Sequence, residues 1–263
     1  MRIPVVLLAA TVIPLLGAAP AAAQLSCRDT ERSSRWGERF CTMETRTLRA
    51  GGTIKVLASP NGGVTVIGWD RNEIELRAKI TASARSDDRA EEIGRGVRIQ
   101  TSGTEIEAEG PRTGDREGWS VSYELRVPRR SDLWVRSNNG GISVEDVSGE
   151  MDLATTNGGL SLANLGGDVR AETTNGGVDV ALGGRRWNGR GLTARTRNGG
   201  VDLVVPDDYG AELEVATRNG GLDFDFPIRV RGRLNRQVTT TLGDGGPPIS
   251  VSTTNGGVTV RRQ

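Results

Sequence analysis

Five arginines fall within thirteen residues and are the strongest candidates for binding chemistry: Arg185, Arg186, Arg190, Arg195 and Arg197. Trp187 lies inside this run, and Arg218 holds the same position in a later copy of a repeat as Arg197 does. A guanidinium group binds phosphate, sulfate or carboxylate through two parallel hydrogen bonds, and an indole offers a flat face to a sugar ring. The cluster therefore predicts a contact surface for an anionic glycan or a related cell-envelope component. The alternative is a solvated surface, since the chain contains 32 arginines and 2 lysines.

Three aspartates hold one outward position in successive copies of the repeat: Asp179, Asp202 and Asp223. A carboxylate ladder can supply the oxygen ligands that Ca²⁺ needs, and paired carboxylates also cleave polysaccharides in β-helix enzymes. The calcium-binding pattern Gly-Gly-x-Gly-x-Asp is absent, however, and nothing else in the sequence assembles a cleft. We therefore interpret the aspartates as a solvated strand face, and we expect neither a cofactor nor enzymatic activity.

The composition excludes several classes of function. The chain of 263 residues has no histidine, which excludes Ser-His-Asp and Cys-His catalysis and a histidine-ligated zinc site. Lys and Arg number 34 and Asp and Glu number 33, and removal of residues 1–23 takes away only Arg2, which leaves 33 of each. A formal net charge of zero argues against a nucleic-acid ligand and against general attraction to a membrane surface.

The first 23 residues have the pattern of a signal peptide. A short positive start precedes an apolar stretch, and Ala21-Ala22-Ala23 is a small-residue cleavage site. We expect the mature chain to begin at Gln24 and to have no transmembrane segment, because no later apolar run approaches the roughly 18 residues that span a bilayer. The predicted location is the periplasm, the cell surface or the extracellular space.

The arginines and aspartates belong to a repeat. Asn-Gly-Gly occurs seven times, beginning at Asn61, Asn139, Asn157, Asn175, Asn198, Asn219 and Asn255. The residues three and five positions after each Asn are apolar, the residue between them is polar, and the residue two positions before is Ser or Thr. This alternation predicts a half-buried strand after each tripeptide.

We predict an all-β fold with one short helix, in which units of about 18 residues with Asn-Gly-Gly turns stack as a β-solenoid. Asn and Gly accept positive φ at low cost, so each tripeptide is expected to turn the chain sharply. The aligned Ser/Thr column could form a ladder of hydroxyls and the Asn column a ladder of amides. The alternative is a meander or sandwich of β-hairpins, because Asn-Gly is the strongest short hairpin signal.

The chain divides into four predicted parts. The signal peptide is followed by an N-terminal segment, 24–48, in which the only two cysteines, Cys27 and Cys41, are expected to form a disulfide. A β-rich region at 49–130 contains a predicted helix at 86–94 with Ser86 as its N-cap. The solenoid occupies 131–263, and Arg261-Arg262 after its last strand would protect a free sheet edge.

The sequence resembles a known bacterial family of β-strand repeats, the "putative adhesin" family. The resemblance rests on the strand Tyr123–Pro128, on the segment Leu133–Val144, on the repeated Asn-Gly-Gly units and on the short preceding helix, and it extends over roughly 50–260. The family name implies surface adhesion, and the family supplies no catalytic residues. The arginine-rich stretch 185–197 and the two cysteines depart from the family pattern.

These observations predict a non-enzymatic, exported binding module of the cell envelope or surface, with an anionic glycan as a candidate ligand. One alternative is a passive structural or stress-associated envelope protein whose sheet faces only stack or oligomerise. A minor alternative is a carbohydrate-active β-helix enzyme.

Overall fold

The computed structural model describes residues 25–28, 38–227 and 236–263. Within these ranges the protein is all-β with one helix, as predicted. The predicted signal peptide, 1–23, lies outside the described residues. In the described part of the chain, no helix is long and apolar enough to cross a membrane.

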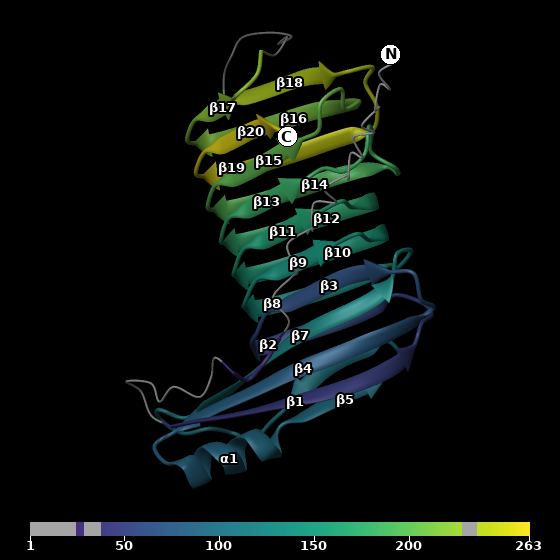
Figure 1. Ribbon diagram of the computed structural model, residues 1–263. Coiled ribbons are helices and arrows are strands. Elements are labelled where there is room, and N and C mark those ends of the chain that lie inside the picture. The colour runs from purple at the N-terminus through teal and green to yellow at the C-terminus, as the bar shows by residue number, and fades with distance from the viewer. Residues whose placement is uncertain (1–24, 29–37, 228–235) are drawn as a thin grey trace, which may run out of the picture.

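The strands form two sheets of ten strands each, and within each sheet the strands follow one another along the long axis of the molecule (Figure 1). In spatial order the first sheet contains β1 (Glu38–Arg49), β4 (Glu73–Ala84), β7 (Gly118–Pro128), β3 (Val64–Trp69), β9 (Ile142–Glu145), β11 (Leu160–Ala163), β13 (Val178–Ala181), β15 (Val201–Val205), β20 (Val258–Arg262) and β17 (Leu222–Phe224). The second sheet contains β18 (Gln237–Leu242), β16 (Ala211–Asn219), β19 (Pro248–Asn255), β14 (Gly191–Asn198), β12 (Gly166–Asn175), β10 (Ser148–Asn157), β8 (Leu133–Asn139), β2 (Ile54–Asn61), β6 (Glu105–Glu109) and β5 (Arg98–Ser102).

The helix α1 (Asp87–Gly96) packs against β1 and β4 at one end of the stack, and β18 lies at the other end (Figure 1). Its predicted N-cap is present, because the Ser86 hydroxyl accepts a hydrogen bond from the backbone N–H of Arg89 at 3.4 Å. Acidic residues follow in the first turn, where they complement the positive end of the helix dipole.

In the body of the stack the chain alternates between the two sheets. Each Asn-Gly-Gly joins a strand of the second sheet to the next strand of the first, as from β10 to β11. Neighbouring strands there are parallel, and equivalent residues of different copies pair, for example Leu160 with Ile142 and with Val178. The hairpin alternative is therefore wrong, because a hairpin would place both of its strands side by side and antiparallel in one sheet.

The apolar columns of the two sheets meet in one continuous core. Leu153 and Val169 from the second sheet and Leu160 and Val178 from the first are at most 1% exposed. They belong to a single cluster of buried side chains that extends along the stack. Burial of each such side chain stabilises the fold by about 1.5–3 kcal/mol. One copy contributes only a few of these side chains and cannot bury them alone, so this stabilisation requires stacked copies.

Two polar columns line the Asn-Gly-Gly corner. The Asn amides form a continuous ladder, in which Nδ2 of Asn157 donates to Oδ1 of Asn139 at 2.8 Å and equivalent bonds join the other copies. The Ser/Thr column does not form the expected hydroxyl ladder. Instead, Oγ1 of Thr155 donates to the carbonyl oxygen of Gly140 at 2.8 Å, and the column repeats this bond. The hydroxyls therefore satisfy backbone acceptors of the neighbouring copy.

The first glycine of the tripeptide is required because two backbones approach closely. A Cβ on Gly158 would overlap the carbonyl oxygen of Gly140, and a Cβ on Gly176 would overlap that of Gly158. The seven repeat Asn residues, all within the described part of the chain, have no positive φ. The expectation that positive φ turns the chain is therefore wrong for Asn, which ends a strand. It is confirmed for the first glycine of three copies, Gly62, Gly199 and Gly256, with φ of 140°, 159° and 150°.

The last copy of the repeat is not the last in space. Strand β19 lies between β14 and β16, and β20 lies between β15 and β17. At this end of the stack the edge strands are β17 in the first sheet and β18, which pairs antiparallel with β16, in the second. Arg261 therefore lies inside a sheet, where its Nη2 binds Asp202 on β15 at 3.1 Å. The prediction that Arg261 and Arg262 protect a free edge is wrong, because the order of strands in space differs from their order in sequence.

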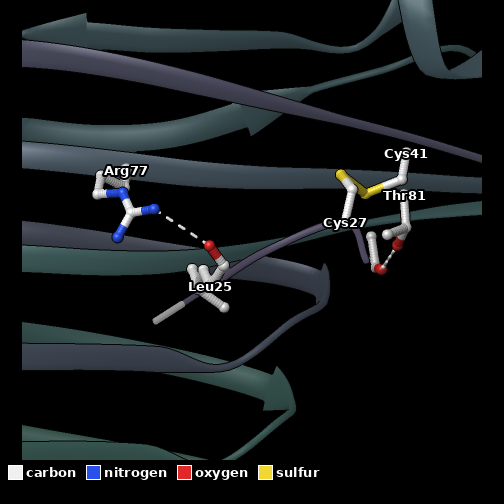
Figure 2. Close-up of a disulfide and its surroundings, with 6 residues drawn as sticks. Leu25, Cys27, Cys41, Arg77 and Thr81 are labelled. Carbon is white, nitrogen blue, oxygen red and sulfur yellow. Dashed lines mark hydrogen bonds between the residues drawn. A yellow bond between two sulfur atoms is a disulfide. The ribbon is translucent and has the colours of Figure 1, made fainter. Parts of the chain in front are cut away.

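The predicted disulfide between Cys27 and Cys41 is present and holds a short N-terminal segment against the first sheet (Figure 2). Nη2 of Arg77 donates to the carbonyl oxygen of Leu25 at 3.1 Å, and the Leu25 N–H donates to Oε2 of Glu124 at 3.1 Å. Arg77 also pairs with Glu124 at 3.0 Å, and the Glu124 side chain is 5% exposed. The backbone of Leu25 therefore forms hydrogen bonds with both members of a largely buried ion pair. Without these bonds, polar atoms of the pair would lack partners and the folded state would be less stable.

Candidate functional site

The arginines that cluster in sequence divide into two groups in space. Arg195 and Arg197 lie on β14 and are exposed on the outer face of the second sheet. Arg185, Arg186 and Arg190 lie in the loop that leads into β14 at its opposite end. Arg190 and Arg195, the members of the two groups that are nearest in sequence, are about 16 Å apart at 3.3 Å per residue along the extended chain, so the two groups form separate surfaces.

Trp187 is a core residue rather than a contact residue. Its side chain is 3% exposed, and its Nε1 donates to the carbonyl oxygen of Gly167 at 2.9 Å. This burial contradicts the predicted stacking role, because neither face of the indole can reach a sugar. Arg190 in the same loop pairs with Asp168 at 2.5 Å.

A shallow groove of about 430 Å³ runs along the outer face of the second sheet beside the Asn-Gly-Gly corner. Its lining includes Arg136, Thr156, Glu172, Thr174, Arg195, Arg197 and Thr254. Arg136 is held by Asp152 at 2.6 Å, and Glu172 is held by Arg170 at 2.8 Å. The one carboxylate of the groove is therefore already paired, and the two β14 arginines keep their charge for a ligand.

Arg218 completes a group of three exposed arginines on this face. It precedes the ladder Asn of β16 as Arg197 precedes that of β14, and the inserted β19 places Thr254 between them. Two strand spacings, about 10 Å, separate the backbones of Arg197 and Arg218. Among the described residues, Arg195, Arg197 and Arg218 have no hydrogen-bond or ion-pair partner. We call these three residues the arginine triad.

The aspartate column is interrupted. Asp179 and Asp202 pair in register, but Thr259 of the inserted β20 separates Asp202 from Asp223. Arg261 pairs with Asp202 at 3.1 Å. The described ranges contain no group of three His, Cys, Asp or Glu side chains that could hold a metal ion. The three aspartates therefore do not form one continuous ladder of carboxylates, and Asp202 has an arginine partner.

The sequence cluster omitted Arg136 and the threonines of the groove. Alignment of the repeat could have found them, because Arg136 and Arg195 both lie three positions before a repeat Asn. Thr156, Thr174 and Thr254 lie one position before it, as Arg197 does. Both positions face outward because successive strand residues point to opposite faces.

Comparison with known proteins places the fold. The chain matches the family model described as Toastrack DUF4097 over residues 57–261. No curated protein matches the chain. Among solved structures, a "putative cell adhesion protein" from Clostridium sporogenes is 10% identical, with 85% of this chain and 100% of that chain covered and a TM-score of 0.42.

A "putative adhesin" from Bacteroides fragilis is 10% identical, with 84% of this chain and 97% of that chain covered and a TM-score of 0.38. A "putative lipid binding protein" from Parabacteroides distasonis is 12% identical, with 84% and 96% covered and a TM-score of 0.34. The family match extends over most of the chain and agrees with the resemblance found in the sequence. The chain belongs to the Toastrack DUF4097 family.

Proposed function

We propose that the protein is an exported, non-enzymatic binding module whose ligand is an anionic glycan of the cell envelope or surface. The observation that carries this proposal is the arginine triad, three exposed guanidinium groups on one sheet face without partners among the described residues.

The geometry of the triad suits sulfate, phosphate or carboxylate groups on an extended polymer. Each guanidinium presents a planar fork of donors, which binds such groups with two hydrogen bonds. Thr254 lies between Arg197 and Arg218 and can bond sugar hydroxyls. A sheet repeats its side chains at fixed spacing, so it can meet charges that recur along a chain.

We further infer that residues 131–263 act as a β-solenoid, a rigid platform for this face. Two observations support a single rigid stack: the unbroken Asn ladder, and the parallel register of β8, β10, β12, β14, β19 and β16. Rigid elements hold side chains in place, which reduces the conformational entropy that is lost when a ligand binds.

Two features support export. The Cys27–Cys41 disulfide is of a kind that persists in oxidising compartments, and the first 23 residues have the signal-peptide pattern.

The test measures retention of the mature chain, residues 24–263, on immobilised dextran sulfate, polygalacturonate and uncharged dextran. We expect retention on the two charged polymers at low salt and release at high salt, because salt screens exposed charges. A triad variant, Arg195→Ala/Arg197→Ala/Arg218→Ala, should bind at least tenfold more weakly, since each charge-assisted bond contributes about 1.5–3 kcal/mol. The matched control is Arg185→Ala/Arg186→Ala/Arg190→Ala, which removes the same charge from the distant loop and should bind as the parent does.

Equal weakening of both variants would refute the triad as the site, because net charge alone would then explain retention. If the parent binds none of the charged polymers, the passive structural alternative is favoured, and concentration-dependent self-association becomes its measurement. Release of reducing sugar from polygalacturonate by the parent would contradict the non-enzymatic proposal.

A further inference from the structure

A second groove lies on the same outer face, at the end of the sheet that carries β5. It has a volume of about 470 Å³ and is formed by β2, β5, β6 and β8. Its lining includes Lys55, Leu57, Gln100, Glu105, Glu107 and Trp134. The arginine triad contributes nothing to it, so it is a separate candidate site.

Trp134 lines this groove and carries an indole N–H from which no other described residue accepts a hydrogen bond. The other described tryptophans each donate Nε1–H to a backbone carbonyl: Trp69 to Glu73, Trp119 to Pro111 and Trp187 to Gly167. The Trp134 Nε1–H has no such partner among the described residues. A partly buried indole normally satisfies its N–H, so this donor is available to a ligand.

The ring of Trp134 is fixed in place by its neighbours. The Arg136 guanidinium carbon lies 4.4 Å from the ring centroid, in a cation–π contact. Arg136 is held in turn by Asp152, to whose carbonyl oxygen and carboxylate it donates at 2.8 and 2.6 Å. Arg136 covers part of the ring but does not line the groove, so the groove adjoins the surface that Arg136 leaves uncovered.

Apolar and polar groups line the groove together with the ring, as a sugar site requires. Leu57 is 39% exposed and is the one large hydrophobic side chain exposed in the described part of the chain. It pairs in register with Glu107, whose carboxylate is exposed and has no hydrogen-bond or ion-pair partner among the described residues. Glu105 is paired with Lys55 at 2.5 Å, so the wall of the groove is acidic overall and disfavours an anion.

We propose that this groove binds an uncharged pyranose unit of a glycan. The C–H face of the sugar packs on Trp134 and Leu57, which removes both apolar surfaces from water. Sugar hydroxyls donate to the Glu107 carboxylate, and a sugar oxygen accepts from the Trp134 Nε1–H. The proposal goes beyond the function proposed above and does not depend on it, because the ligand is uncharged and the arginine triad is not involved.

The experiment follows the indole N–H resonances of the ¹⁵N-labelled mature chain during titration with maltohexaose, cellohexaose and chitohexaose. We expect a saturable shift of the Trp134 resonance, assigned by its loss in Trp134→Phe, with at least one of the three oligosaccharides. Isothermal titration calorimetry, which does not need the indole resonance, should give a Kd raised about tenfold or more in Trp134→Ala and about threefold in Leu57→Ala.

Trp69 supplies a matched control. Its ring also lies under an arginine, with Arg71 4.9 Å from the centroid, but its Nε1 is bonded to Glu73 and it does not line the groove. Trp69→Ala should therefore leave the Kd within twofold of the parent. Thermal unfolding of each variant establishes that a change in Kd does not come from loss of the fold.

Absence of a Trp134 shift with all three oligosaccharides would overturn the proposal, as would equal weakening in Trp69→Ala. A shift with tetramethylammonium but with none of the sugars would assign the groove to a cation instead. Retention of the parent on dextran sulfate is measured separately, so failure here and failure of the arginine triad are distinguishable.

Discussion

Asn255 donates a side-chain hydrogen bond to Asn198 at 2.7 Å, although 57 residues separate them in the chain. Asn219, which lies between them in sequence, donates to Asn255 at 2.8 Å from the other side. The last copy of the repeat is thus inserted between two earlier copies. It fills the space between β14 and β16 in one sheet and between β15 and β17 in the other.

Removal of this inserted copy is expected to destabilise the whole C-terminal part of the stack. A chain ending at residue 247 loses four core side chains, Ile249, Val251, Val258 and Val260. Their burial contributes about 6–12 kcal/mol at 1.5–3 kcal/mol each, which is comparable to the net stability of a typical domain. Thermal unfolding followed by circular dichroism should show a lower midpoint and a broader transition.

A synthetic peptide of residues 248–263 should restore the transition when added to the shortened chain, because β16 and β17 would regain their missing neighbours. A peptide of the same composition in scrambled order is the control. Unchanged stability of the shortened chain would contradict the insertion.

The two glycines of one tripeptide should respond differently to substitution. A Cβ on Gly176 would overlap the backbone of Gly158, whereas a Cβ on Gly177 meets nothing nearer than 3.6 Å, at the oxygen of Gly200. We expect Gly176→Ala to lower the free energy of unfolding by about 3 kcal/mol, as in an overpacked core, and Gly177→Ala to lower it by less than about 1 kcal/mol. Urea denaturation measures both, and equal losses would show that turn conformation rather than close approach requires glycine.

The buried hydroxyl column should contribute through its backbone acceptors. Thr173 is 6% exposed and donates to the carbonyl oxygen of Gly158 at 2.8 Å. Thr173→Val keeps the shape and leaves this acceptor without a partner, so we expect a loss of about 1–2 kcal/mol. The neighbouring Thr174→Val, on the outer face, should change the unfolding free energy by less than about 0.5 kcal/mol.

Tyr123 should be one position where removal of a polar group stabilises the protein. Its side chain is 1% exposed, and its hydroxyl has no hydrogen-bond partner among the described residues. Burial of the unpaired hydroxyl costs about 1–3 kcal/mol, so Tyr123→Phe should raise the free energy of unfolding by about 1 kcal/mol at pH 7. A loss of stability in urea denaturation would instead reveal a partner for this hydroxyl.

Alkaline pH should destabilise the C-terminal end of the stack through Tyr209. Burial raises the pKa of Tyr209 to about 12, from an ordinary value of 10.0. A raised pKa in the folded state gives stability that is present below about pH 10 and is lost as the pH rises toward 12. Tyr209→Phe should therefore reduce the loss of unfolding free energy between pH 9 and pH 11.5, and an unchanged pH profile would contradict this assignment.

Local patterns predicted much of the fold. Alternation after each Asn-Gly-Gly predicted strands such as Val178–Ala181, and Ser86 predicted the start of the helix. The two cysteines predicted the disulfide. The strands and the helix start depend on residues that are neighbours in sequence, and two cysteines allow only one disulfide pairing. Such features can be predicted from the sequence alone.

The candidate site was predicted less well. Arg195, Arg197 and Arg218 are exposed on one face, but Trp187 of the same sequence cluster is buried, and Trp134, which lies outside that cluster, lines a groove. Sequence proximity grouped Arg190 with Arg197, although a whole strand separates them. Whether two residues come together depends on which face of the strand each side chain points to and on which end of the strand each residue lies near. Proximity in sequence gives neither.

The sequence by itself determined the strands, the face of each strand that enters the core, and the polar columns at the corner. It could not determine which copies are neighbours, because every copy presents the same columns of Asn, Ser or Thr and aliphatic residues, and any two can pair in register. Only the tertiary structure placed Asn255 between Asn198 and Asn219, and with it Thr254 between Arg197 and Arg218. The physical reason is that strand pairing is non-local: the chain returns and enters the stack between the two preceding copies, where β19 and β20 each gain a neighbouring strand on both sides.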